Sequence, residues 1–314
     1  MGQKNNNSLL IVTYHYIRKE NPYPFPGIHS LKLENFIEQI QWMKDRFHIA
    51  TPQEVVTFAH GNGDLPAPSI FLTFDDGLTE HVKVTEEVLE PLGIKAEFSL
   101  SSRPFKENRA LMVHKIHWLR ATTDPEEFRE EFFHLLPEAE IEMAKGKEAI
   151  HEATKHNPYD TPEHAIIKYL ITFQLPHRLV DDIATEMLRN RGISEASFCE
   201  EFYMNEQQIR YLTETGHIIG NHGHTHIPFS RLEEKHLQKE IRGSKSYFEK
   251  LTGVPQNWVS YPHGRQWAIP SDADAFCKNF GFTIGLGVNK GWNRKEQSPY
   301  HLNRVNPNEV EGVV

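Results

Sequence analysis

Residues 69–77 read Ser-Ile-Phe-Leu-Thr-Phe-Asp-Asp-Gly, and this stretch decides the predicted fold. Its first six residues are mostly apolar, β-branched or aromatic without helical spacing, which is typical of a strand buried on both faces. Two carboxylates and a glycine follow at once, where the chain must turn out of the strand. Chemistry collects at the carboxyl ends of the strands in parallel α/β folds. We therefore expect a parallel α/β protein whose reaction centre includes Asp75 and Asp76.

The chain on either side of this strand alternates between strand-like and helix-like patterns. Apolar residues recur at helical spacing in 33–47, whereas 8–17 and 94–100 read as buried strands. The alternation resumes after residue 205, where Asn205 and Gln208 form a capping-box pattern. Further strands are expected at 217–220, 258–261, 282–286 and 302–306. This order predicts a parallel sheet with helices around it.

The middle of the chain has a different pattern. From about 105 to 200 it is rich in Glu, His, Lys and Leu at helical spacing, and it contains no convincing strand. We therefore predict one domain over residues 1–314 that carries a mostly helical insertion at about 105–200.

Composition and charge exclude several classes of protein. The 314 residues carry a formal net charge of -9 and no block of Lys and Arg, which argues against nucleic-acid binding. The two cysteines, Cys199 and Cys277, form no CxxC pair and no disulfide framework, as expected in a reducing compartment. The apolar run near the N-terminus is too short for a signal peptide, and no stretch approaches the ~20 apolar residues of a membrane span. We expect a cytoplasmic protein without a transmembrane segment, and the sequence does not indicate its oligomeric state.

Asp75, Asp76, His222 and His226 form the candidate reaction centre. Asp-Asp-Gly after a strand can be an ordinary turn. However, two unpaired carboxylates at a buried strand end would raise one pKa sharply, and a bound cation removes that problem. The spacing of four between the histidines places two imidazoles on one side of a helical turn, a common way to hold a transition metal. With Asp76 they form a two-His, one-carboxylate set with open positions, which suits Zn²⁺ or, as alternatives, Co²⁺, Ni²⁺ or Mn²⁺.

Three motifs resemble those of the polysaccharide deacetylase family, also called the NodB-homology family. Thr-Phe-Asp-Asp-Gly at 73–77 is similar to the first motif. Residues 219–226, which end in His-Gly-His-Thr-His, are similar to the second motif, with Gly223 where Ser or Thr is usual. Ser-Tyr-Pro-His-Gly at 260–264 resembles the third motif, often Arg-x-Pro-Tyr-Gly.

The resemblance covers roughly residues 8–102 and 203–306. It implies a distorted (β/α) barrel and removal of an N-acetyl group from a sugar in a polysaccharide or glycan precursor. The implied partner is an N-acylated sugar, with nucleotide-linked and lipid-linked forms both open. The insertion, including Lys-Ile-His-Trp at 115–118, is similar to a bacterial branch that we associate with surface-polysaccharide gene clusters.

The resemblance also implies roles for individual residues. Asp75 would be the general base, acting on a metal-bound water that attacks the amide carbon. Asp76, His222 and His226 would be the metal ligands. The metal and the backbone N–H of His263, at the position of the third-motif Tyr, would stabilise the tetrahedral oxyanion.

Two parts of the family machinery are absent from their usual positions. Ser260 stands where the family has the Arg that orients the base, and Arg304 is a candidate to replace it in space. The late Leu-x-His motif that supplies the general acid has no match, so His15, His263 and His301 remain candidates for the acid. Substrate contacts are expected from His15, His81 and Tyr261.

Two other functions remain open. One is a deformylase or another C–N hydrolase that acts on a lipid-linked or small cyclic substrate. The other is an inactive metal-containing domain that binds glycans through the helical insertion. The missing acid motif and Ser260 favour inactivity, whereas Asp75 argues against it because a binding module has no need of a base.

Overall fold

The computed structural model describes residues 7–66, 68–144, 151–152, 155 and 162–313. The chain divides into two compact units. The first unit consists of Met1–Glu20, Ser30–Glu107 and Glu200–Val314, and the second of Asn21–His29 and Asn108–Cys199. All the predicted site residues lie in the first unit.

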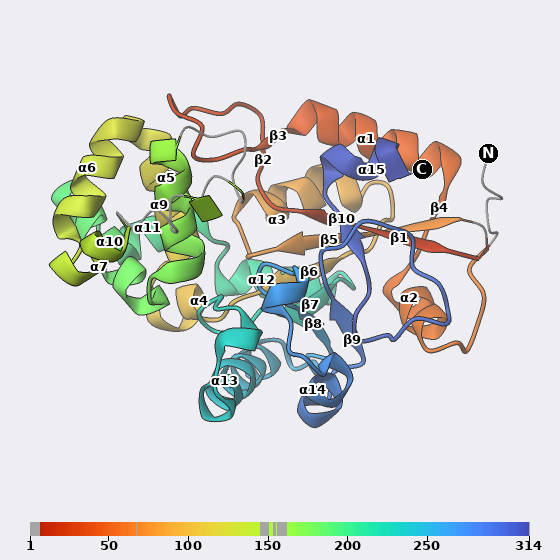
Figure 1. The fold of residues 1–314 in the computed structure, drawn as a ribbon. Coiled ribbons are helices and arrows are strands. Elements are labelled where there is room, and N and C mark those ends of the chain that lie inside the picture. The colour runs from red at the N-terminus through yellow and green to blue at the C-terminus, as the bar shows by residue number, and fades with distance from the viewer. Residues whose placement is uncertain (1–6, 67, 145–150, 153–154, 156–161, 314) are drawn as a thin grey trace. The chain divides into compact units, whose positions relative to one another are not determined.

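The first unit is built on an eight-stranded parallel sheet (Figure 1). Its strands are β1 (Leu9–Tyr14), β4 (His48–Ile49), β5 (Ser69–Asp75), β6 (Glu97–Leu100), β7 (Ile218–Asn221), β8 (Trp258–Ser260), β9 (Ile284–Leu286) and β10 (Arg304–Val305). They lie in the order β10-β1-β5-β6-β7-β8-β9, and β4 pairs with the start of β5. A separate parallel pair is formed by β2 (Ile17–Arg18) and β3 (Leu31–Lys32).

The sheet curves into a nearly closed barrel, which confirms the predicted fold. Leu286 at the end of β9 forms a parallel bridge with Leu302, two residues before β10. The Leu302 N–H donates to the Gly285 carbonyl at 2.8 Å, and the Gly287 N–H donates to the Leu302 carbonyl at 2.9 Å. Because β10 also pairs with β1, the last segment of the chain contacts both edges of the sheet.

Helices surround the strands of the first unit (Figure 1). They are α1 (Leu33–Arg46), α2 (Pro52–Ala59), α3 (Glu80–Val84), α4 (Arg103–Glu107), α12 (Glu206–Glu214), α13 (Glu234–Thr252), α14 (Ala273–Phe280) and α15 (Val310–Val313), with the short helices η1 (Thr85–Leu89), η3 (Phe229–Arg231), η4 (Gln266–Ala268) and η5 (Pro307–Glu309). The predicted capping box at Asn205 and Gln208 begins α12. A π-helical turn, η1, directly follows α3, and Gly93 with φ 68° comes after it.

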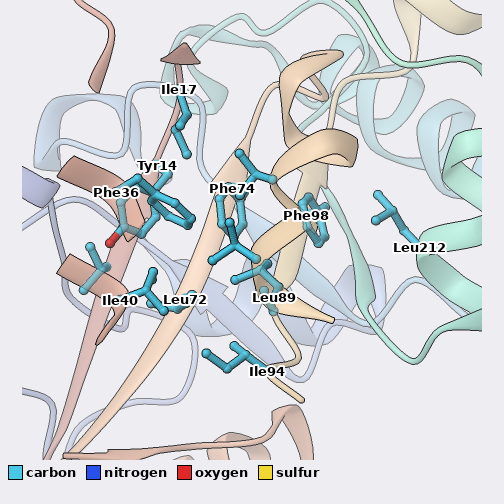
Figure 2. Packing of buried hydrophobic residues seen from close by; sticks show 14 of the residues in the cluster. Tyr14, Ile17, Phe36, Ile40, Leu72, Phe74, Leu89, Ile94, Phe98 and Leu212 are labelled. Carbon is cyan, nitrogen blue, oxygen red and sulfur yellow. The ribbon is translucent and has the colours of Figure 1, made fainter. Parts of the chain in front are cut away.

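Alternation along the strands separates an outer core from the barrel interior. Tyr14, Phe74 and Phe98 come from three neighbouring strands, and their rings stack at centroid distances of 5.3 and 4.9 Å on the outer face (Figure 2). There they pack with helix residues such as Phe36 of α1 and Leu212 of α12. This packing fixes the strands from outside and leaves the interior positions for other side chains.

The interior positions change from apolar to polar along the strands. One apolar cluster contains residues near the amino ends of β1 and β5, residues of β8 and β9, and residues of α2. Its strand members include Leu9, Ile11, Phe71, Trp258 and Ile284. Nearer the carboxyl ends, the buried positions of the same alternation are Thr13, Thr73, Asp75, Ser99 and Ser260. The register pairs Thr13 with Thr73 and Asp75 with Ser99, so these side chains share one end of the barrel.

The second unit contains helices and no strand among its described residues. They are α5 (Met112–Thr122), α6 (Pro125–Leu135), α7 (Glu138–Ala144), α9 (Pro162–Tyr169), η2 (Leu170–Gln174), α10 (His177–Asn190) and α11 (Glu195–Phe202), the last of which ends in the first unit. A buried ion cluster joins α5 to α10 and α11, because Lys115 Nζ lies 2.6 Å from Asp181 and 3.0 Å from Glu195. The description of this segment as an insertion into a single domain stays a prediction.

The described helices include none that is both long and apolar enough to cross a membrane.

Candidate metal and catalytic site

Asp75 and Asp76 occupy different environments although they are neighbours in sequence. Asp75 is the last residue of β5, and its side chain belongs to the inward-facing series. Asp76 leaves the strand with φ 80°, and its N–H donates to the Ser99 carbonyl at 2.9 Å. The change in backbone direction gives the two carboxylates separate partners.

The segment His222–His226 follows β7 as a loop and not as a helical turn, so the predicted helical spacing was wrong. Gly223 and His226 have φ values of 76° and 62°, which a helix does not permit. The His222 N–H continues the sheet by donating to the Leu100 carbonyl at 3.0 Å. The loop nevertheless brings the two imidazoles together, with ring centroids 4.7 Å apart.

Asp76, His222 and His226 form a buried donor set. Oδ1 of Asp76 lies 3.5 Å from Nε2 of His222 and 3.5 Å from Nε2 of His226. One possible ligand atom from each residue lies within 4.8 Å of the others. Two ligands bound to a tetrahedral zinc ion at 2.0–2.2 Å lie about 3.3–3.6 Å apart. The donor types and their spacing therefore fit a divalent transition metal.

A backbone contact orients the first histidine. Nδ1 of His222 lies 2.7 Å from the Ser260 carbonyl, an acceptor, so Nδ1 carries the proton and Nε2 presents its lone pair. Metal-binding histidines commonly have such a partner on the other ring nitrogen. The Ser260 carbonyl thus supports the orientation of His222 directly.

Backbone strain concentrates at this site. Among the described residues, four non-glycine residues have positive φ, and three of them are Asp76, His226 and His263. Such conformations cost of order 1–3 kcal/mol each and persist where surrounding contacts enforce them. The surroundings therefore hold two of the possible ligands in conformations that they would not adopt alone.

Arg304 contacts Asp75, as the sequence suggested it could. NH1 and NH2 of the guanidinium each lie 2.8 Å from a different oxygen of Asp75, in a bidentate pair. NH2 also donates to Ser260 Oγ at 2.7 Å, and that hydroxyl lies 3.3 Å from Asp75 Oδ2. Arg304 and Ser260 therefore both contact the carboxylate of Asp75.

The charges around Asp75 favour its ionised form. Burial alone would raise its pKa, but Arg304, followed by His222 and His15, holds the pKa below its usual value. Glu97, on the neighbouring strand, responds in the opposite way: burial, and then the charge of Asp75, raises its pKa to about 8. The barrel end thus holds one ionised carboxylate paired with Arg304 and one carboxyl group that favours the neutral form.

The three candidates for the general acid differ in their surroundings. Nε2 of His15 lies 4.0 Å from Asp75 Oδ2, and its side chain is 41% exposed. The ring of His263 lies 5.1 Å from that of His226. His301 is half-buried, its Nε2 lies 3.3 Å from Asn289 Nδ2, and burial lowers its pKa.

His81 and Tyr261 are fully buried, which contradicts their predicted role as substrate contacts. Nε2 of His81 lies 2.7 Å from the His15 carbonyl and its ring packs against Phe74, so it supports the backbone of His15. The Tyr261 hydroxyl donates to the Tyr300 carbonyl at 2.7 Å. Tyr261 directly follows β8 and points away from the site because the side chain before it, Ser260, faces inward, whereas His81 lies on α3.

Sequence reasoning missed Glu240, whose carboxylate contacts the loop between His222 and His226. One signal was available: Glu240 lies on the buried stripe of α13 with Leu237, Ile241 and Ser244. A charged residue in an apolar helical stripe requires polar partners.

Comparisons with known proteins agree with the motifs. Residues 168–285 match the family model described as polysaccharide deacetylase. A curated Bacillus subtilis (strain 168) protein, YxkH, whose name assigns it provisionally to the polysaccharide deacetylases, is 24% identical over 109 residues. That match covers 35% of this chain and 38% of the length of YxkH.

Solved structures share the fold over nearly the whole chain. Streptococcus pyogenes deacetylase PplD, in complex with acetate, superposes with a TM-score of 0.59 at 16% identity and covers 98% of this chain and 99% of its own. IcaB from Ammonifex degensii has a TM-score of 0.59 at 14% identity, with 97% and 94% covered. A de-N-acetylase from Aggregatibacter actinomycetemcomitans has a TM-score of 0.57 at 14% identity, with 98% and 100% covered.

The family match, the curated relative and the shared barrel agree with the motifs found in the sequence. Over residues 168–285 the chain is similar to the polysaccharide deacetylase family.

Proposed function

We propose that the protein is a metal-dependent N-deacetylase that acts on a sugar in a polysaccharide or glycan precursor. The observation that carries this proposal is the donor set of Asp76, His222 and His226 beside a buried, Arg-paired Asp75. A binding module has no need of a carboxylate that is held ionised next to three possible ligands. The printed names of the relatives, which include deacetylases and a de-N-acetylase, support acetyl as the group removed.

In the proposed reaction, Asp76, His222 and His226 hold the ion, with zinc as the expected metal. When bound, a divalent ion lowers the pKa of water and polarises the amide carbonyl. Asp75 takes the proton from the water that attacks the amide carbon. Arg304 and Ser260 fix the plane of the Asp75 carboxylate and keep it ionised before the proton arrives. The ligand His222 keeps its orientation because Nδ1–H is bound to the Ser260 carbonyl.

We assign the protonation of the leaving amine to His263. A base and an acid must reach the substrate at different atoms, one at the water and the other at the amide nitrogen. His15 lies next to Asp75, whereas the ring of His263 contacts His226. His15 is therefore better placed to assist the base. His301 contacts Asn289 and, among the described contacts, none of Asp76, His222 and His226, so the acid falls to His263. The positive φ of His263 also turns its backbone away from β8 at this point, which is compatible with the oxyanion contact expected from its N–H.

The test is a panel of N-acyl substrates. Metal-free protein is reconstituted with Zn²⁺ or Co²⁺ and incubated with nucleotide-linked, lipid-linked and oligomeric N-acetylated sugars, and with N-formyl analogues. Release of acetate from a sugar substrate, abolished by a chelator and restored by metal, is the expected result. Release of formate alone would favour the deformylase alternative. Tight metal binding with no acyl release from any substrate would favour the inactive glycan-binding alternative.

A further inference from the structure

Glu240 of α13 makes a dense set of contacts with the loop that carries the two histidines. Its Oε2 accepts hydrogen bonds from the backbone N–H groups of His224 and Thr225, both at 2.8 Å. Its Oε1 accepts from the Thr225 hydroxyl, also at 2.8 Å. The carboxylate therefore binds the loop at three points between His222 and His226.

The backbone of this loop is shaped to receive a carboxylate. Gly223 has φ 76°, and the two N–H groups that follow it point to the same oxygen of Glu240. Consecutive N–H groups that converge in this way form an anion-binding concavity. A Cβ added at Gly223 would lie 3.3 Å from Glu240 Oε2 and 2.9 Å from a ring carbon of Phe229, so the glycine permits the close approach.

Among the described residues, no cationic side chain pairs with the Glu240 carboxylate. It is 8% exposed, and none of the ion pairs within the described ranges includes it. Hydrogen bonds to an ionised carboxylate are roughly twice as strong as those between neutral groups. Since a buried carboxylate requires such partners, Glu240 and the loop stabilise each other.

The contact lies directly before a strained residue. Thr225 gives Glu240 two hydrogen bonds, and His226, the next residue, has φ 62°. A non-glycine residue keeps such a conformation only where its neighbours enforce it. The positive φ of His226 accompanies the approach of its Nε2 to 3.5 Å from Asp76 Oδ1.

We propose that Glu240 is a positioning residue that sets the metal affinity of the site by holding the loop in its ligand-bearing conformation. This inference rests on the proposed function, because it requires the metal site of Asp76, His222 and His226. Glu240 touches neither the ion nor the substrate in this account; it acts on His226 through Thr225. Partners of this kind typically change metal affinity by about 10- to 100-fold when they are replaced.

The test measures zinc affinity by competition with a chromophoric chelator, on full-length protein shown to be folded by circular dichroism. Glu240→Gln keeps the size of the side chain but replaces one carboxylate oxygen with an NH₂ group, which cannot accept the hydrogen bonds that the loop donates. We expect zinc affinity to fall about 10- to 100-fold. Thr225→Val probes the same contact from the loop and is expected to weaken zinc binding less, because the Thr225 N–H bond remains. Thr225→Ser retains the hydroxyl and is expected to restore the affinity. Glu234→Gln, an exposed glutamate on the same helix, is the matched control and should bind zinc as the wild type does.

A double variant separates positioning from general stabilisation. If the two residues act through one contact, Thr225→Val should cost less in the Glu240→Gln background than alone. Unchanged zinc affinity of folded Glu240→Gln and Thr225→Val, alongside a lowered unfolding midpoint of the metal-free protein, would show a merely structural role and overturn the inference. Wild-type protein that binds no zinc would instead overturn the proposed metal site, so the two failures are distinguishable.

Discussion

Replacing Arg304 with methionine removes the charge partner of Asp75 and keeps a long side chain in the barrel. The native guanidinium uses all five of its N–H groups: Nε donates to the Gly287 carbonyl, NH1 to Thr73 and Asp75, and NH2 to Asp75 and Ser260, at distances of 2.7 to 3.1 Å. Arg304 and Asp75 are 1% and 2% exposed. Water therefore has little access to replace the lost contacts.

The expected loss of stability follows from this burial. Removing one partner of a buried ion pair costs about 3–5 kcal/mol, because the other charge is left without compensation. The pH dependence has a definite sign. Arg304 holds the pKa of Asp75 below its usual value, so the pair stabilises the fold above the pKa of the unfolded carboxyl and loses this effect as pH falls. In Arg304→Met, burial raises the pKa of Asp75 with no guanidinium to offset it, so the difference between wild type and variant should be largest near pH 7 and shrink towards pH 4 as the variant's carboxylate takes up a proton.

Urea unfolding of metal-free protein at pH 7, 5.5 and 4, followed by circular dichroism and fluorescence, measures this loss. Arg294→Met is the matched control, because Arg294 is exposed, and we expect its effect to stay within about 0.5 kcal/mol. An Arg304→Met variant that unfolds within about 1 kcal/mol of wild type at pH 7 would refute the reasoning. So would a loss that grows as the pH falls.

Two further predictions concern groups near the same centre. Burial, and then the charge of Asp75, raises the pKa of Glu97 to about 8, so folding favours its neutral form and the free energy of unfolding should fall as pH rises from about 4.5 to about 8. In Glu97→Gln this decline should be shallower. Urea titrations at pH 5, 6.5 and 8 that show the same decline in both proteins would contradict the assignment. If His263 protonates the leaving amine, His263→Gln should slow acetate release from N-acetyl sugars by about 10²- to 10⁴-fold. The same variant should slow hydrolysis of an activated aryl acetate ester much less, because that leaving group needs no proton. Equal losses of rate on both substrates would show that His263 is not the acid.

Local patterns were sufficient to predict the scaffold of the site. Residues 69–77 combine a buried strand with a change to carboxylates and glycine, and both features depend on neighbours in sequence. The structure extends the strand one residue beyond the predicted 69–74, to Asp75, and places Asp76 at positive φ. The strand order of a parallel sheet then brings the loop after β7 to the same end as β5, with only β6 between them.

Contacts between distant segments were harder to predict. Arg304 and Asp75 are 229 positions apart, and the contact exists because β10 returns to pair with β1. The sequence offered Arg304 as a candidate but contained no spacing that fixes this pairing. The conformation of His226 was also missed. A separation of four residues between His222 and His226 occurs in a helix, but it also occurs in a loop in which Gly223 turns the backbone. The contact of Glu240 with this loop was missed because the sequence does not show that α13 packs against the loop.

The most direct test of the central claim compares Asp75→Asn with the wild type. The wild-type protein is reconstituted with zinc, and the N-acetylated oligosaccharide that it deacetylates fastest is used for both proteins. We expect Asp75→Asn to bind zinc within about threefold of the wild-type affinity, because Asp76, His222 and His226 are intact, and to release acetate about 10²- to 10⁴-fold more slowly. Acetate release at the wild-type rate by the zinc-loaded variant would contradict the assignment of Asp75 as the base.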